Sequence, residues 1–403
     1  MDTQERKLKF FNDAGEDETN RTKLVFRLFR RLCAGLIILI LVMLLIFNYD
    51  KLNIDDMRRA LAKIDFSLNK STGTKNQISY TPDKQNCYLK YKNGLAVVSA
   101  DSIKVFDNTG YQFSSNQLLY SNPAARVSKD YILSYDMGGG NTLSISNSFS
   151  VIYTRSFENT ISYASINDNG YLVAVTTVNG YKNLISVYSG SHKEIFKMYS
   201  ANRYIASAVL LNDNKTLVTV SLNSEDTVLN SYITAYKITN DGDKAKTAEI
   251  ELADQTAGFI ECMGTNICVI TDKSAVFADK DLKINNTVEF SDKKIYNYTV
   301  AGKRCALVLD AGDNPAGSYV IITDDKGKIT AQGETDYVAV CASFLDSGLA
   351  LLTYSDIRVV SVNSKENLKQ TKQISIDDEF SQIIGSGKKI FLIAGSYTKI
   401  INI

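Results

Sequence analysis

The chain has 403 residues and a nearly balanced charge, with 45 Lys and Arg against 44 Asp and Glu. A net charge of +1 and a pI near 7.4 supply no strong field for attracting nucleic acid, so we expect no nucleic-acid partner. Apolar residues make up 44% of the chain, which is enough for a large core.

Residues 1–31 form a charged segment that we expect to be a disordered cytoplasmic tail. The tail carries an acidic cluster at residues 16–18 and ends in a basic stretch that holds no acidic residue. The basic side chains of this stretch are Arg21, Lys23, Arg27, Arg30 and Arg31.

Residues 32–49 are predicted to form one transmembrane helix. The run LCAGLIILILVMLLIF at residues 32–47 holds no charge. As a helix it covers roughly 24 Å, slightly less than a hydrocarbon core of about 30 Å. Arg30 and Arg31 at one end and Tyr49 at the other can reach the interfaces and close that gap. Membrane lipid is therefore an expected partner, with Arg27, Arg30, Arg31 and Tyr49 flanking the anchor.

Two alternatives for the apolar segment are weaker. A cleaved signal peptide would have small residues after the apolar run, whereas Asn48, Tyr49 and Asp50 follow it. A lipoprotein would have its cysteine after the run, whereas Cys33 lies at its beginning. The basic flank keeps the N-terminus in the cytoplasm by the positive-inside rule. We therefore expect a single-pass protein of the cell membrane whose C-terminal domain is extracytoplasmic.

Residues 50–75 are predicted to form a juxtamembrane amphipathic helix and a linker. An apolar stripe with heptad-like spacing runs along the expected helix. A short helix docked on the domain or on the membrane surface is the simpler interpretation, and weak dimerisation is the alternative. The stripe consists of Ile54, Met57, Leu61, Ile64 and Leu68.

Residues 76–403 are predicted to form an all-β domain, a β-propeller of four-stranded blades. Short strands punctuated by Gly, Asn and Asp recur every eight to twelve residues and group by four, with a period of roughly forty residues. Eight groups are favoured, with seven as the rival count. The last group, from Ser381, offers three strands, so residues 77–80 are expected to supply the missing outer strand. The groups begin near Cys87, Ala124, Ile161, Tyr204, Gly258, Ile295, Tyr337 and Ser381.

The stretch ILSYDMGGGNTLSISNS at residues 132–148 contains a "YDxGG" strand-turn feature made by Tyr135, Asp136, Gly138 and Gly139. Together with NGYLVAVTT and GYKNLISVYSG, it resembles an uncharacterised family of single-pass membrane proteins with an extracytoplasmic β-propeller. Most members come from anaerobic Gram-positive bacteria. The resemblance implies fold and topology but no activity, because the family is a domain of unknown function.

Motifs for chemistry are sparse, and we expect no catalytic residue, cofactor or metal site. His192 is the single histidine and lies in the turn SGSHKE, where we expect an exposed turn residue. The acidic turns INDNG, ITNDGDK, LDAGDNPAG and ITDDKG lack the spacing of an EF-hand loop, so ordinary Asx turns are expected. Asp310 and Asp313 are the best of these weak calcium candidates. The glycines at residues 138–140 open no helix and predict a hairpin turn.

Five cysteines follow the predicted anchor: Cys87, Cys262, Cys268, Cys305 and Cys341. Cys262 and Cys268 flank the turn MGTNI, so a disulfide between them is possible. The alternative is that all five are small buried side chains.

Three functional hypotheses follow. The first is a membrane-anchored binding or scaffold module for an envelope protein or glycan, since a rigid ring presents many loops on one face. The second is a sensor that signals through the tail. The third is a hydrolase or lyase of envelope polymers, which would need a cluster of carboxylates in the funnel. Without tryptophan the chain lacks the Asp-box of sialidase-like propellers and the docking motifs of quinoprotein propellers, which argues against the best-known enzymatic propellers. It also lacks the WD dipeptide, which argues against the WD40 type.

Overall fold

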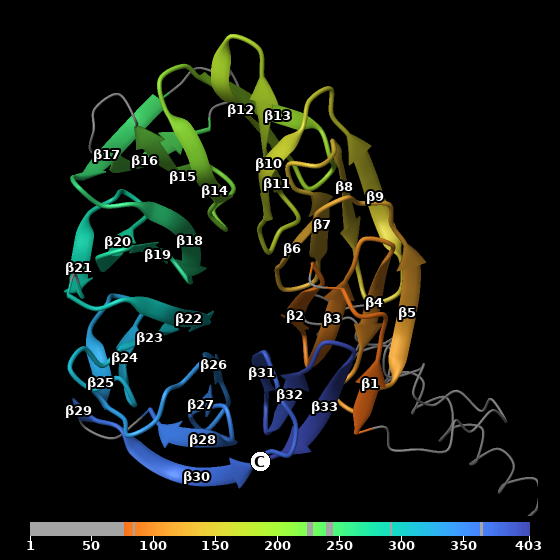
Figure 1. The fold of residues 1–403 in the computed structure, drawn as a ribbon. Coiled ribbons are helices and arrows are strands. Elements are labelled where there is room, and N and C mark those ends of the chain that lie inside the picture. Colours follow the sequence, from red (N-terminus) through yellow and green to blue (C-terminus); the bar gives the residue numbers. More distant parts are fainter. Residues whose placement is uncertain (1–75, 84, 224–228, 239–244, 291, 363–365) are drawn as a thin grey trace, which may run out of the picture. The chain divides into compact units, whose positions relative to one another are not determined.

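The computed structural model describes residues 76–403 except 84, 224–228, 239–244, 291 and 363–365 (Figure 1). These residues belong to one compact unit, Asn69–Ile403. The predicted tail, transmembrane helix and juxtamembrane stripe lie outside the described residues. Within the described part, no helix is long and apolar enough to cross a bilayer.

The described residues form eight antiparallel sheets that follow one another around a ring (Figure 1). This confirms the prediction of eight blades and rules out seven. Blade 1 contains β2 (Cys87–Tyr91), β3 (Gly94–Val98), β4 (Ser102–Phe106) and β5 (Gln112–Gln117). Blade 2 contains β6 (Pro123–Val127), β7 (Ile132–Asp136), β8 (Thr142–Ser146) and β9 (Val151–Ser156). Blade 3 contains β10 (Ile161–Ile166), β11 (Leu172–Val178), β12 (Tyr181–Tyr188) and β13 (Glu194–Ser200). Blade 4 contains β14 (Tyr204–Leu210), β15 (Thr216–Asn223), β16 (Asn230–Lys237) and β17 (Ala245–Leu252).

The second half of the ring repeats this pattern, with one short strand added to blade 6. Blade 5 contains β18 (Ala257–Met263), β19 (Asn266–Thr271), β20 (Ser274–Asp279) and β21 (Ile284–Glu289). Blade 6 contains β22 (Ile295–Ala301), β23 (Arg304–Asp310), β24 (Ser318–Asp324) and β25 (Ile329–Glu334), with β29 (Glu366–Asn367) parallel at its edge. Blade 7 contains β26 (Cys341–Phe344), β27 (Leu349–Leu352), β28 (Asp356–Ser361) and β30 (Lys369–Ser375). Blade 8 contains β31 (Gln382–Ser386), β32 (Lys389–Ile393), β33 (Tyr397–Asn402) and β1 (Gln77–Ser79).

The ring closes as the unfinished last group predicts. Strand β1 pairs antiparallel with β33, with Ile78 opposite Thr398. The Tyr80 hydroxyl then donates to the Ala394 carbonyl at 3.0 Å. Blade 8 is therefore built from both ends of the domain, which removes the free edge that an incomplete blade would expose.

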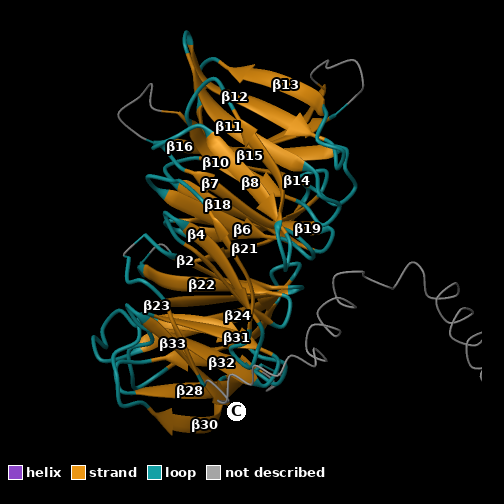
Figure 2. Ribbon diagram, turned by 90° about the vertical axis from the view of Figure 1, so that its right-hand side faces the viewer, coloured by secondary structure: helices purple, strands orange, loops and turns teal. Residues whose placement is uncertain are grey.

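The core lies between the blades. The second strand of a blade, such as β7 or β19, is buried along its whole length because neighbouring sheets cover both of its faces. The outer strand β9 alternates between half-buried and exposed residues, and β30 is almost fully exposed. Figure 2 shows the same unit from the side, with strands forming the body and loops gathered at their ends.

The YDxGG feature turns out to join three blades. Asp136 ends β7, is 5% exposed, and accepts the backbone N–H groups of Ser121 at 2.9 Å and Asn122 at 2.7 Å. A Cβ on Gly140 would lie 2.4 Å from the Asp136 carboxylate, so glycine is needed there. The Gly138 N–H donates to the Ile161 carbonyl of blade 3 at 2.8 Å. The predicted hairpin turn is confirmed, and its role is structural.

Candidate functional site

The two faces of the ring carry different loops. Because strands within a blade are antiparallel, the turns after its first and third strands leave on one face, for example residues 167–171 and 189–193. We call this the funnel face. The turns after the second strands and the linkers between blades leave on the other, for example residues 179–180 and 201–203. We call this the linker face.

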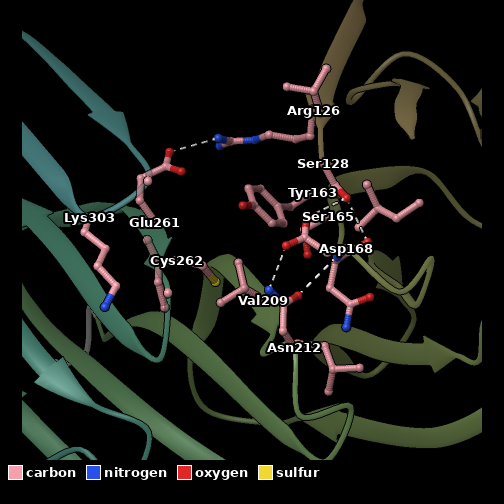
Figure 3. A pocket seen from close by; sticks show the side chains of 17 residues that line it. Arg126, Ser128, Tyr163, Ser165, Asp168, Val209, Asn212, Glu261, Cys262 and Lys303 are labelled. Atoms are coloured by element: carbon pink, nitrogen blue, oxygen red, sulfur yellow. Dashed lines mark hydrogen bonds and ion pairs between the residues drawn. The ribbon is translucent and has the colours of Figure 1, made fainter. Parts of the chain in front are cut away.

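A cavity of about 390 Å³ opens where the first strands of several blades meet the turns of the funnel face (Figure 3). Arg126 comes from β6, Tyr163 from β10, Glu261 from β18, and Asp168 and Lys303 from turns. First strands line the central channel of the ring, because each is the innermost strand of its sheet and no other strand lies between it and the ring axis. Polar residues at these positions therefore meet across the ring.

An ion pair crosses this cavity between blades 2 and 5. The Arg126 guanidinium donates to Glu261 Oε1 at 3.1 Å, and the two side chains are 30% and 27% exposed. Tyr298 donates to the same oxygen at 3.4 Å. Burial alone would lower the pKa of Arg126, but the neighbouring Tyr163 phenol and the Glu261 carboxylate raise it above its ordinary value. The pair links blade 2 to blade 5 across the central channel, and we call it the channel brace.

The second carboxylate of the cavity is also bonded to its surroundings. Asp168 accepts from Ser128 Oγ at 3.1 Å and from Asn212 Nδ2 at 2.8 Å, which ties blade 2 to blades 3 and 4 (Figure 3). A hydrolase would need a carboxyl kept protonated by apolar surroundings. Glu261 faces a guanidinium instead. Within the described residues no three His, Cys, Asp or Glu side chains are grouped to hold a metal ion. The geometry of this cavity favours a structural brace over acid–base catalysis.

The possible disulfide between Cys262 and Cys268 is not formed, and both residues are free thiols. Cys262 lies opposite Ile267, while Cys268 lies opposite Glu261. Adjacent residues of a strand point to opposite faces, so the two sulfurs leave the hairpin on different sides. Cys268 is buried, as are Cys305 and Cys341, whereas Cys87 is half-buried. The alternative of five buried side chains therefore holds for three of them.

Cys262 lines the cavity rather than the core. Its side chain is exposed to the channel, but the surrounding protein buries the thiol enough to raise its pKa to about 12. A thiol with this pKa is protonated near neutral pH and is a weak nucleophile.

His192 lies in the predicted turn but is half-buried rather than exposed. Its backbone has a φ of 63°, and its ring stacks on Tyr153 of blade 2 at 3.9 Å between centroids. Burial lowers its pKa. The histidine thus fills a contact between two blades, which the polar sequence of the turn does not indicate.

Three of the four acidic turns lie within the described residues, and their side chains bond to the backbone. Asn167 accepts the N–H groups of Asn169 and Tyr171, both at 3.0 Å, which confirms the Asx turn expected for INDNG. Asp324 of ITDDKG accepts two N–H groups in the same way. Asp310 accepts the Lys294 N–H at 3.0 Å, whereas Asp313 is exposed. The turn ITNDGDK falls largely outside the described residues.

The linker face carries most of the exposed large apolar side chains of the described residues. Tyr354 is 78% exposed and Leu119 is 93% exposed. Tyr111, Ile152 and Ile284 are the exceptions, since they lie at the end of the strands that meets the funnel face. The linker-face set is Leu119, Met137, Tyr181, Tyr199, Tyr204, Leu229, Phe259, Tyr296 and Tyr354. This pattern could have been recognised in the sequence, because these residues lie in or beside the turns after second strands and the linkers between blades, which alternate with the turns of the funnel face along the repeat.

Charge also differs between the faces. Described acidic residues outnumber basic ones in the turns and linkers of the linker face: Asp83, Asp101, Glu158, Asp254, Asp272, Asp292, Asp313, Asp336, Asp377, Asp378 and Glu379 against Arg203, Lys273, Lys293 and Lys294. Among the described residues, basic ones prevail in the turns of the funnel face: Lys92, Lys129, Lys193, Lys215, Lys280, Lys283, Lys303, Lys326, Lys328 and Lys388 against Asp107, Asp130, Asp168, Asp213, Asp281, Asp325 and Asp346.

Solved structures similar to this chain are β-propellers. The C-terminal WD40 domain of Sif2 matches at a TM-score of 0.54 with 11% identity, covering 81% of this chain and 98% of that chain. The Dos1 propeller matches at 0.51 with 10% identity, covering 81% and 95%. Sqt1 from Chaetomium thermophilum matches at 0.51 with 10% identity, covering 81% and 99%. At these identities the likeness establishes the propeller fold alone.

Comparison by sequence identifies the family without an activity. Among curated proteins, none matches the chain. The model of a family of unknown function, DUF5711, matches residues 68–403 and so covers the whole propeller. The YDxGG feature and the repeat pattern lie inside that match. The chain therefore belongs to the DUF5711 family of unknown function.

Proposed function

We propose that this protein is a membrane-anchored module whose extracytoplasmic propeller binds a protein of the cell envelope through the linker face. The observation that carries the proposal is the gathering of exposed aromatic and aliphatic side chains on that face. Exposed apolar groups cost free energy in water, and aromatic side chains are enriched where proteins contact one another. The acidic turns between them supply a polar rim.

The anchor and the orientation come from the sequence. The uncharged run at residues 32–47 and the basic flank before it support one crossing with the propeller outside. The bonded carboxylates of the channel support a binding role over catalysis. The sensor hypothesis shares this binding face and adds a requirement for the tail.

Photo-crosslinking in the protein's own cells tests the binding face. A benzophenone amino acid would replace Tyr204 or Tyr354 on the linker face, or Tyr111 on the funnel face. Tyr111 is a matched control because it is 51% exposed, close to the 49% of Tyr204. We expect one envelope protein to be crosslinked from Tyr204 and Tyr354 and not from Tyr111. Equal capture from all three positions, or capture of glycan alone, would contradict the proposal.

Two deletions complete the test. Removing residues 32–49 should move the protein from the membrane fraction to the soluble fraction, and retention at the membrane would refute the anchor. Removing residues 2–20 should leave the crosslinked partner unchanged. Loss of that partner with the tail would favour the sensor hypothesis instead.

A further inference from the structure

A cleft of about 460 Å³ lies on the linker face between blades 5 and 6. Phe259 of β18 and Tyr296 of β22 line it, and their side chains are 48% and 50% exposed. Gly258 also lines the cleft, and a Cβ added there would meet nothing within 4 Å. The cleft therefore presents aromatic surface beside open space.

The aromatic lining is held in place from behind. The Phe259 ring packs against the Tyr298 ring at 5.5 Å between centroids and 44° between planes. Tyr298 in turn donates to Glu261 of the channel brace at 3.4 Å. Because Phe259 rests on a fixed neighbour, a ligand would not have to order this side chain on binding.

One carboxylate lines the cleft. Asp272 follows β19 and is exposed, and its Oδ1 accepts the Thr256 N–H at 2.7 Å, which orients the group. Three cations lie close in sequence to the lining: Lys273, Lys293 and Lys294. Lys273 Nζ lies 2.6 Å from Asp254 Oδ2, and Lys293 Nζ lies 4.0 Å from Asp292 Oδ2. The cleft thus combines aromatic faces with a carboxylate on a face where acidic turns prevail.

We propose that this cleft receives an arginine side chain from the protein partner, an assignment that rests on the proposed function. A guanidinium is attracted to aromatic faces and also pairs with a carboxylate, so one side chain would use both features of the cleft. Arginine fits better than lysine because its planar group stacks on rings and is more weakly hydrated. The excess of acidic residues in other turns of the linker face, such as residues 377–379, would attract a basic segment of the partner to this face. At the cleft itself, the rings and Asp272 select the arginine.

The experiment compares two peptides that differ in charge but hardly in shape. The probes are acetyl-Ser-Leu-Arg-Leu-Ser-amide and the same peptide with citrulline in place of arginine. The full-length protein would carry 4-fluorophenylalanine at Phe259, or at Tyr111 as the control position. The fluorine signal would then be followed by NMR as each peptide is added up to its solubility limit.

We expect the arginine peptide to shift the signal at position 259 in a saturable way and the signal at position 111 not at all. The citrulline peptide should need at least roughly tenfold higher concentration, since it lacks the positive charge on which both the cation–π contact and the charge-assisted hydrogen bond depend. Tyr296→Ala should weaken arginine binding by roughly 2- to 30-fold. Asp272→Asn should reduce the difference in affinity between the arginine and citrulline peptides. Thermal unfolding of each variant would check that the fold is intact.

Equal responses to the two peptides, or no response at position 259, would overturn this inference. So would unchanged arginine binding in Tyr296→Ala. The proposed function is tested separately, because capture of a partner from Tyr204 and Tyr354 does not depend on the cleft. If the partner is still crosslinked while neither peptide shifts the signal at position 259, the proposed binding face is supported and the arginine site is refuted.

Discussion

The linker face and the funnel face arise from the same eight repeats, yet they are built differently. On the funnel face, side chains such as Asp168 and Asn167 bond to the backbone or to neighbouring turns. On the linker face, large side chains such as Tyr204 and Tyr354 are exposed, at 49% and 78%. Both ends of the ring hold their turns with carboxylates, such as Asp168 on one face and Asp136 on the other. They differ in the number of large apolar side chains left exposed.

The largest expected effect concerns how the linker face is held together. Asp136→Ala would remove a buried carboxylate that accepts two backbone N–H groups of the linker between blades 1 and 2. Hydrogen bonds to a charged group contribute about 1.5–3 kcal/mol each, so for two such bonds we expect a loss of at least about 3 kcal/mol in the free energy of unfolding. Urea denaturation followed by circular dichroism would measure it.

A second turn of the same face supplies the control. Gly395 lies between β32 and β33, and a Cβ there would meet nothing within 4 Å, so Gly395→Ala should leave stability nearly unchanged. Gly140→Ala, by contrast, should resemble Asp136→Ala, because its Cβ would displace the carboxylate. A urea midpoint for Asp136→Ala equal to that of the wild type would show that the linker face does not depend on this carboxylate.

The next prediction concerns partner binding. Tyr181 begins β12 of blade 3 and Tyr204 begins β14 of blade 4, and their side chains are 47% and 49% exposed. Replacing both by Ser should weaken capture of the envelope partner by about 2 kcal/mol, or roughly 30-fold, as for aromatic residues at the centre of an interface. Quantitative pull-down with the crosslinked partner would measure the change. Tyr111→Ser on the funnel face should have no effect, and an equal loss there would abolish the distinction between the faces.

The channel brace gives a smaller effect, in stability rather than binding. Arg126→Met or Glu261→Gln alone should lower the free energy of unfolding by about 1–2 kcal/mol, because each leaves a partly buried charge without its partner. The double variant should lose less than the sum, with a coupling of about 1 kcal/mol. Thermal denaturation of the wild type, the two single variants and the double variant would provide this double-mutant cycle.

The exposed pair Lys273–Asp254 is a suitable reference for the brace. Its side chains are 34% and 75% exposed, so its coupling should be smaller and should vanish at high salt. Strictly additive losses for Arg126 and Glu261 would mean that the contact across the channel does not contribute to stability.

The repeat pattern could be predicted because each strand and turn is encoded by residues close together in sequence. The closing strand pairs the two ends of the domain, and it could be predicted because the strands of each group can be counted. An unfinished blade at Ser381 and a spare strand at residues 77–80 are visible without a structure.

The Cys262–Cys268 hypothesis was wrong for a local reason. The hairpin closes at Met263 and Asn266, which sets Cys262 opposite Ile267. With a turn of only two residues, Gly264 and Thr265, Cys262 and Cys268 are not opposite each other, so the disulfide would have required a longer turn.

The channel brace could not be predicted in the same way. Arg126 and Glu261 are separated by 135 residues and lie on strands whose sequences give no sign that they face each other. Which first strands oppose one another depends on the number of blades and on the curvature of the ring. The function of Asp136 was equally hidden, since the residues it binds belong to a linker rather than to its own hairpin.

The smallest effect concerns the funnel face and pH. His192 is the only histidine, its Nδ1 is buried without a hydrogen-bond partner in the described structure, and burial lowers its pKa. The unfolded chain therefore takes up a proton near its ordinary pKa of about 6.5, while the folded protein resists protonation until lower pH. The stability contribution is thus complete above about pH 6.5 and is lost as the pH falls towards the folded pKa.

Asn is the matched replacement because it tolerates the positive φ of this turn. Urea midpoints at pH 7.5 and 5.5 should fall further for the wild type than for His192→Asn, and parallel falls in both proteins would assign the pH dependence to other groups.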